Sequence, residues 1–195
     1  MGNVGAIILA AGGATRFGGP KQLLKFQGET LVRRALRAAT EGGCTQVAVV
    51  VGESGTLIKD ELSKMPGCVV ENPDWPRGLG TSIRCGLRLL LVSMPPLDAA
   101  VVMACDQPLV EGATIAALLA QQEKSGKAIV ASRYANTVGI PALFGRSCFA
   151  ALLALPDDSG AKTLIESRSD EVAWIEFEKG AIDIDTRADF EQLTS

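Results

Sequence analysis

The stretch from Val4 to Lys25 constrains this chain most, because it joins an apolar run to a glycine-rich loop that carries positive charge. The run from Val4 to Ala10 is rich in isoleucine and alanine, which is typical of a buried strand. Glycines 12, 13, 18 and 19 follow, together with Arg16 and Lys21. Glycine lets a backbone approach a ligand closely, and two separated cations can hold different phosphates of one polyphosphate. The stretch therefore predicts a loop that grips a triphosphate.

Two better-known phosphate-binding loops do not fit this stretch. A Walker loop requires GxxxxGK[ST], but Gly19 and Pro20 follow Gly18 where Lys and Ser or Thr would stand. A dinucleotide fingerprint requires GxGxxG, which no register of the loop supplies. A flexible glycine turn with solvated cations stays open as the simpler alternative.

The loop resembles a family signature, which it carries as LAAGGATRFGGPK over residues 9–21. This is similar to the LAAGxGxRxGxxK pattern of nucleotidyltransferases with a MobA-like, GT-A-like fold, with Ala14 in place of the second glycine. The residues at 22–24, QLL, look most like the branch that includes the molybdenum cofactor cytidylyltransferases. The resemblance implies that Arg16 and Lys21 are catalytic. It implies nucleotide contacts from Leu9, Ala10, Ala11, Gly12, Gly13, Arg16 and Lys21.

Length and composition predict one domain over residues 1–195. A chain of 195 residues that is 47% hydrophobic can bury one core. The net charge of -3 includes no basic run long enough to follow a nucleic-acid backbone. The five cysteines are widely spaced without a CxxC pair, which favours buried thiols in a reducing cytoplasm over disulfides or zinc. With no apolar run long enough to span a membrane, we expect a cytoplasmic protein that binds neither nucleic acid nor membrane.

Apolar runs alternate with amphipathic segments along the chain. Strands are expected at 4–10, 46–51, 68–70, 99–105, 128–131, 172–177 and 181–184. Helices are expected at 29–40, 54–64, 81–92 and 111–124, and after Asp185 and Thr186. In the first helix the arginines lie largely opposite the apolar side. This order predicts an α/β domain with a mostly parallel sheet covered by helices on both faces, and the resemblance implies the GT-A-like version, known from nucleotide-diphospho-sugar transferases.

The chain contains no histidine. That absence excludes Ser-His-Asp and Cys-His catalysis, HExxH zinc sites and the iron facial triad. A metal would be held mainly by oxygen atoms, which favours Mg²⁺ or Mn²⁺.

Asp106 directly follows the apolar run 99–105. Open α/β sheets form their ligand crevice at the carboxyl ends of the strands, so an acidic group here is a candidate ligand-binding residue. A turn or capping aspartate is the simpler alternative. The residues at 105–108, CDQP, resemble the family's CD[MQ]P element, which implies that Asp106 is catalytic and binds the metal.

A second element lies at 71–87, where turn residues precede a helix start. Amides at that start, with the Ser82 hydroxyl and Arg84, could meet a phosphate or a ribose, whereas a plain loop with a tryptophan plug is the alternative. The segment resembles the family's NPxWxxGxxxS element. That resemblance implies nucleotide contacts from Asn72, Gly78 and Ser82.

The remaining similarities lie in the last third of the chain. The residues at 138–144, VGIPALF, resemble a GxPxxF element, with Ile140 where a polar residue often stands. The residues at 157–162, DDSGAK, look like GDxGAR with Asp157 for glycine and lysine for arginine. The resemblance implies acceptor contacts from Gly139, Pro141, Asp158, Gly160 and Lys162. Asp183 and Asp185, in a stretch resembling DxDTxxD, are further metal-ligand candidates.

These residues together predict nucleotidyl transfer. A phosphate oxygen of an acceptor attacks the α-phosphorus of a nucleoside triphosphate, and positioning and cations stabilise the charge that develops. The resemblance implies CTP as donor and molybdenum-loaded molybdopterin as acceptor, with release of pyrophosphate. It also implies a molybdenum hydroxylase apo-enzyme as a possible partner. Relatives that transfer guanylyl groups tend to read LAGG where this chain has LAAG, so Ala11 favours a pyrimidine.

Three alternatives stay open from the sequence. The chain could be a guanylyltransferase or a sugar-phosphate or alditol-phosphate nucleotidyltransferase. It could also be a non-catalytic accessory protein that binds the molybdenum cofactor for a hydroxylase. The combination of Arg16, Lys21 and Asp106 argues against a role in binding alone.

Overall fold

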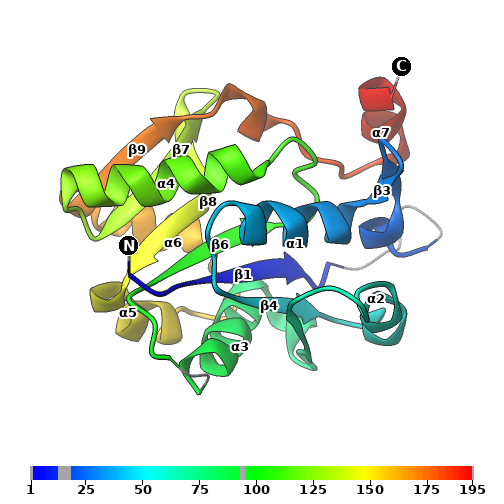
Figure 1. The fold of residues 1–195 in the computed structure, drawn as a ribbon, viewed down its shortest axis with the longest axis horizontal. Coiled ribbons are helices and arrows are strands. Elements are labelled where there is room, and N and C mark those ends of the chain that lie inside the picture. The colour runs from blue at the N-terminus through cyan, green and yellow to red at the C-terminus, as the bar shows by residue number, and fades with distance from the viewer. Residues whose placement is uncertain (1, 13–18, 93–94, 195) are drawn as a thin grey trace.

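A seven-stranded sheet in the order β5-β4-β1-β6-β8-β7-β9 forms the middle layer (Figure 1). The computed structural model describes residues 2–12, 19–92 and 95–194. The strands of this sheet are β1 (Val4–Ala10), β4 (Gln46–Val51), β5 (Cys68–Glu71), β6 (Ala99–Ala104), β7 (Ile129–Tyr134), β8 (Thr137–Gly145) and β9 (Val172–Glu176). A separate ribbon pairs β2 (Lys25–Phe26) with β3 (Glu29–Thr30).

Strand β1 lies inside the sheet and pairs in parallel with β4 on one side and β6 on the other. Its Ile7 is opposite Ala48 of β4 and Val102 of β6. A parallel strand of this kind is buried on both faces, which is why its sequence is apolar throughout rather than alternating. The predicted strand over 4–10 is confirmed with its bounds.

Helices cover both faces of the sheet (Figure 1). The helices are α1 (Leu31–Glu41), α2 (Gly55–Glu61), α3 (Leu79–Leu91), α4 (Gly112–Ser125), α5 (Phe149–Leu153), α6 (Ala161–Ser167) and α7 (Arg187–Thr194). Helices α1, α2 and α4 pack on one face, with Ala6 and Ile8 of β1, and helices α3, α5 and α6 pack on the other, with Ile7. The predicted fold class is confirmed.

Strand β8 is a feature that the sequence did not reveal. It runs antiparallel between β6 and β7 and follows β7 through a turn in which Ala135 and Asn136 have φ of 47° and 59°. The β7–β8 pairing shifts register between Ala131 and Ser132. Gly139 and Pro141 lie within the strand, and both residues are depleted in strands, so the segment carries no clear strand pattern.

The predicted strand at 181–184 is wrong. A 3₁₀ turn occupies Glu178–Ala181, and the residues that follow it up to 185 do not pair as a strand. The apolar Ile184 is instead fully buried in a small cluster with Phe26 and Leu31, outside the sheet. The Ile184 amide donates to the Asp106 carbonyl at 2.9 Å, so this segment lies beside the end of β6.

Helix ends and faces also differ from expectation. Helix α3 begins at Leu79, two residues before the predicted start, and α2 ends at Glu61 rather than near residue 64. Arg34 of α1 is buried, with 7% exposure, although the arginines of this helix were expected to lie largely on its solvent side. None of the helices in the described part of the chain has the length and apolar character required to cross a membrane.

Gly86 lets helix α3 approach the sheet closely. A Cβ at this position would lie 2.6 Å from Ile7 Cγ2 and 2.9 Å from Val50 Cγ2, and both side chains are buried. We expect Gly86→Ala to lower the free energy of unfolding by about 2 kcal/mol through overpacking. At this chain length that corresponds to a loss of about 4–8 °C in Tm by calorimetry. Gly19→Ala, where a Cβ meets nothing within 4 Å, is the control, and an equal Tm for Gly86→Ala and the unmodified protein would contradict the expectation.

Candidate active site

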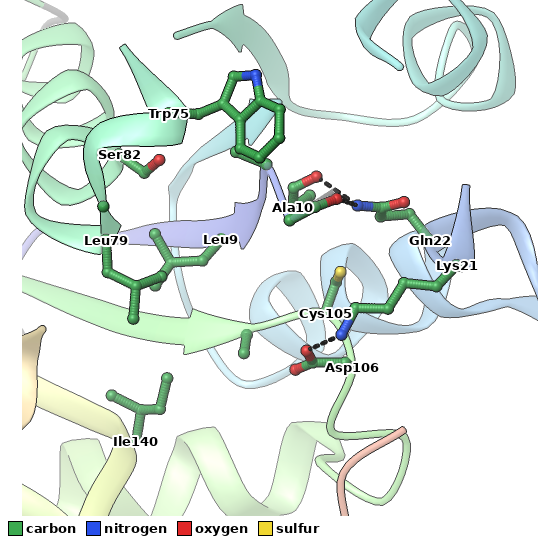
Figure 2. A pocket seen from close by; sticks show the side chains of 14 residues that line it. Leu9, Ala10, Lys21, Gln22, Trp75, Leu79, Ser82, Cys105, Asp106 and Ile140 are labelled. Atoms are coloured by element: carbon green, nitrogen blue, oxygen red, sulfur yellow. Dashed lines mark hydrogen bonds and ion pairs between the residues drawn. The ribbon is translucent and has the colours of Figure 1, made fainter. Parts of the chain in front are cut away.

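A cavity of about 330 Å³ opens at the carboxyl edge of the central strands (Figure 2). It lies at the ends of β1 and β6, where an open α/β sheet forms its ligand crevice. The start of α3 and one residue of β8 complete its wall. The lining residues are Leu9, Ala10, Ala11, Gly12, Lys21, Gln22, Trp75, Gly78, Leu79, Ser82, Ala104, Cys105, Asp106 and Ile140.

Lys21 and Asp106 form the charged centre of this cavity. The Lys21 Nζ donates to Asp106 Oδ2 at 2.7 Å and to Asp185 Oδ1 at 3.1 Å. It also donates to the Ile184 carbonyl at 3.2 Å. Burial lowers the pKa of Lys21, but the two carboxylates raise it by more, so the net pKa lies above its ordinary value. Lys21 is therefore a permanent cation near neutral pH.

Buried hydrogen bonds fix the turn that carries Asp106. The Arg34 guanidinium donates to the Pro108 carbonyl through Nε at 3.2 Å and Nη2 at 3.1 Å. The Gln107 Nε2 donates to the carbonyls of Ile140 at 3.2 Å and Gly180 at 3.0 Å. Arg34 is thus buried because it holds this turn and stacks on Phe26, with 5.0 Å from its Cζ to the ring centroid. These bonds position Asp106 without occupying its carboxylate.

Gln22 shapes the end of β1 where that strand borders the cavity. Its side chain is 1% exposed, and Nε2 donates to the carbonyls of Ala10 at 2.8 Å and Gly12 at 3.0 Å (Figure 2). The amide therefore holds the backbone where β1 turns into the loop. Sequence reasoning used Gln22 only as a family resemblance, and its role became visible only from these contacts.

The residues predicted from the 71–87 element divide into two groups. Gly78 and Ser82 line the cavity, together with Trp75, the tryptophan of the alternative plain-loop interpretation. Asn72 lies behind the wall, where its Nδ2 donates to Thr81 Oγ1 at 2.8 Å and Ser82 Oγ at 3.0 Å. Asn72 therefore supports Ser82 rather than facing the cavity.

None of the five residues predicted to contact the acceptor lines this cavity. Those residues are Gly139, Pro141, Asp158, Gly160 and Lys162. Ile140, between two of them, does line it, and a Cβ at Gly160 would lie 3.6 Å from Leu79 Cδ1. The Lys162 Nζ is 3.8 Å from Glu166 Oε1 on the surface of α6. Leu79 is a lining residue that the sequence did not single out, and Ile140 was noted there only as a departure from the family element.

The remaining nucleotide-site predictions lie at the glycine-rich loop. Leu9, Ala10, Ala11, Gly12 and Lys21 all line the cavity. Gly13 and Arg16 lie outside the described residues. Every nucleotide-site residue predicted in this loop therefore lines the cavity, as far as the structure describes the loop.

Asp106 and Asp185 offer a donor set that suits a hard divalent cation. Both direct a carboxylate oxygen at one cation, the Lys21 ammonium. Carboxylate oxygens are the ligands that Mg²⁺ and Mn²⁺ prefer. In the described part of the chain, no three His, Cys, Asp or Glu side chains are grouped to hold a metal, so a cation here would take its other ligands from substrate or water. The pKa of Asp183 is raised by burial and by Asp185 and Asp106.

Comparison with protein families gives one decisive match. The family model described as the MobA-like NTP transferase domain matches residues 6–172. The chain belongs to this family. Its nucleotidyltransferase fold accounts for the cavity at the strand ends, and the match stops before Asp185.

Curated relatives match this chain over part of their length. The bifunctional IPC transferase and DIPP synthase of Rubrobacter xylanophilus is 42% identical over 93 residues, or 45% of this chain and 21% of the relative. The nicotine blue oxidoreductase of Paenarthrobacter nicotinovorans is 38% identical over 84 residues, or 43% of this chain and 41% of the relative. The aligned region thus spans less than half of each of these relatives.

A solved structure matches over almost the whole chain. The crystal structure of Rv0371c from Mycobacterium tuberculosis H37Rv has a TM-score of 0.81 and 28% identity, covering 99% of this chain and 97% of its own. A structure of the same protein is a complex with manganese and has a TM-score of 0.78.

The ion pair at the centre of the site predicts competition between Lys21 and a divalent cation. Lys21→Met removes an ammonium from two carboxylates that remain, so we expect Mn²⁺ to bind the free protein about tenfold more tightly, after discounting for solvent screening. Titration calorimetry measures this affinity. Lys162→Met, which removes the ammonium beside Glu166, is the matched control and should leave the affinity unchanged. Unchanged or weaker Mn²⁺ binding by Lys21→Met would count against competition between the Lys21 ammonium and the metal for the same two carboxylates.

Proposed function

We propose that this chain is a Mg²⁺-dependent nucleotidyltransferase that transfers CMP from CTP to the terminal phosphate of molybdenum-loaded molybdopterin. The products are pyrophosphate and a molybdopterin cytosine dinucleotide. The proposal rests on one observation: Lys21 and Asp106 form an ion pair in the cavity that residues 9–12, at the end of β1, also line. A molybdenum hydroxylase apo-enzyme in the cytoplasm is the proposed recipient of the product.

The reaction needs positioned charge more than a protein base. The acceptor's phosphate monoester is already ionised near neutral pH, so its oxygen attacks the α-phosphorus without a histidine. The bond to the pyrophosphate oxygen breaks, and the leaving group carries away the electron pair. Lys21 stabilises charge on the phosphates, and Arg16 would contribute a second cation. Asp106, with Asp185 as the second candidate ligand, would hold Mg²⁺, which would supply Lewis-acid stabilisation of that charge.

The cavity separates polar from apolar groups in a way that suits two substrates. Figure 2 shows Lys21, Asp106 and Gln22 on one side and Leu9, Leu79 and Ile140 on the other. Phosphates would lie on the charged side, against the glycine-rich loop. The apolar side would receive a flat ring system, since isoleucine and leucine offer no hydrogen bonds to a polyol. This arrangement favours the pterin acceptor over an alditol phosphate.

The choice of base rests on Ala11. Its side chain lines the cavity and is 8% exposed, so its methyl reduces the space at the strand end. A misfit of one methyl group is worth ~1–3 kcal/mol, which supports a preference for CTP over GTP of roughly 10-fold to 200-fold. Backbone hydrogen bonds to cytosine would add to this preference.

Removing the charge of Asp106 tests the catalytic centre. Asp106→Asn keeps the shape of the side chain but loses the carboxylate, so we expect turnover to fall by at least ~10²-fold in a folded protein. Pyrophosphate release with CTP and the molybdenum-loaded acceptor measures it. Asp98→Asn is the matched control, because Asp98 directly precedes β6 at the end away from the cavity. There its Oδ2 accepts a hydrogen bond from the Asn3 amide at 2.8 Å. Near-normal turnover by Asp106→Asn would remove this residue from the mechanism.

The base preference is tested by comparing kcat/KM across the four nucleoside triphosphates. We expect CTP to be preferred in the unmodified protein and Ala11→Gly to shift the ratio toward GTP without abolishing CTP use. Comparable values for CTP and GTP would overturn the cytidylyl assignment and leave nucleotidyl transfer standing. If the protein binds the acceptor but releases no pyrophosphate with any of the four triphosphates, it would instead be an accessory cofactor-binding protein.

A further inference from the structure

Two loops meet directly behind the apolar wall of the cavity. The Gly80 amide, at the start of α3, donates to the Asp157 carbonyl at 2.9 Å. Gly78 has φ of 131°, and a Cβ there would collide with that same carbonyl. A Cβ at Gly80 would collide with the Pro156 carbonyl. The two backbones are therefore in contact where only glycine fits.

The Asp157 side chain ties these loops together a second time. Its Oδ1 accepts from Arg84 Nη2, and its Oδ2 lies 2.5 Å from Arg77 Nη2. Arg84 also donates to the Leu155 carbonyl, so one guanidinium binds both the backbone and the side chain of this loop. The hydrogen bond from Arg84, with the charges of both arginines, holds the pKa of Asp157 below its ordinary value. The carboxylate is thus charged throughout the neutral range.

The residue held between these contacts is Leu79. It lies between Arg77 and Gly80, lines the cavity and keeps 55% of its surface exposed, which is high for a large apolar side chain. Burial does not hold Leu79 in place, because more than half of it faces open space. Its position instead depends on the backbone contacts and ion pairs on either side.

We propose that Asp157 is a positioning residue that holds Leu79 in the cavity wall through Arg77 and Arg84 and thereby sets the affinity for the acceptor. The inference rests on the proposed function, since it assigns the Leu79 side of the cavity to the acceptor. Arg84 carries most of the effect, because its side chain is 16% exposed whereas that of Arg77 is 63% exposed. An ion pair shielded from water is weakened less by screening than an exposed one.

Asp157→Asn tests the proposal because it keeps the side-chain shape and removes the charge. We expect KM for the acceptor to rise about tenfold while kcat changes by less than about threefold, since the reacting groups are untouched. Glu176→Gln is the matched control, because Glu176 is likewise held by an arginine, Arg133, but lies outside the cavity lining. A changed kcat with an unchanged acceptor KM, or equal effects from both variants, would overturn the proposal.

A second set of variants separates the two arginines. Arg84→Gln should reproduce the KM effect of Asp157→Asn, whereas Arg77→Gln should have a smaller effect. If Arg77→Gln raised KM more than Arg84→Gln, the assigned division between them would be wrong. The double variant Asp157→Asn with Arg84→Gln should raise KM by less than the product of the two single effects, because both changes remove the Arg84–Asp157 ion pair.

Amide hydrogen exchange gives a readout that does not depend on turnover. The Gly80 amide is bonded to the Asp157 carbonyl, so Asp157→Asn should speed exchange in the 78–82 segment while Glu176→Gln leaves it unchanged. Faster exchange with no detectable transfer to any acceptor would support the positioning role and reject the proposed function. Unchanged exchange, with Tm near that of the unmodified protein, would reject the positioning role.

Discussion

The burial of β1 between two parallel neighbours is the constraint on which the rest of the site depends. Because Leu9 of β1 is in register with Ala104 of β6, the two strands end side by side. Just beyond the end of β6, the Cys105 amide donates to the Leu9 carbonyl at 3.2 Å, and the next residue along the chain is Asp106. The end of β1 and the acidic turn therefore lie side by side, and the bonds from Arg34 and Gln107 hold that turn in place. A shift of one residue in this register would turn the strand's side chains to the wrong faces.

The central part of the fold could be predicted because its signals are local. Strands β1, β4 and β6 are continuous apolar runs, and their parallel order follows from the helices between them. Strand β8 could not be predicted in this way, because glycine and proline interrupt its pattern and its pairing partners determine its conformation. The segment at 181–184 was misleading because its apolar Ile184 is buried in a small cluster outside the sheet rather than in a strand.

The position of a site residue could be predicted where that residue follows a strand in the sequence. It could be predicted less well where the residue depends on contacts with residues far away in the sequence. Asp106 and Lys21 were identified from position and charge. Arg34 was assigned to solvent because amphipathic patterns treat charge as exposed, yet its guanidinium finds the Pro108 carbonyl and the Phe26 ring inside the protein. No sequence pattern encodes such a partner. The contact of Asp157 with two arginines could not be predicted for the same reason, because Arg84 and Asp157 lie 73 residues apart in the sequence.

The bond between Lys21 and Asp185 joins residues 164 positions apart. A chain emerging from the ribosome would complete the central strands and the glycine-rich loop long before residue 185 was available. During synthesis Lys21 would therefore have Asp106 but not the final carboxylate, and Ile184 would not yet cover Phe26 and Leu31. The charged centre thus reaches its full set of partners only after Asp185 has been made. Because the chain is made from its N-terminus, the charged centre is completed only after the central strands that carry it could already have folded.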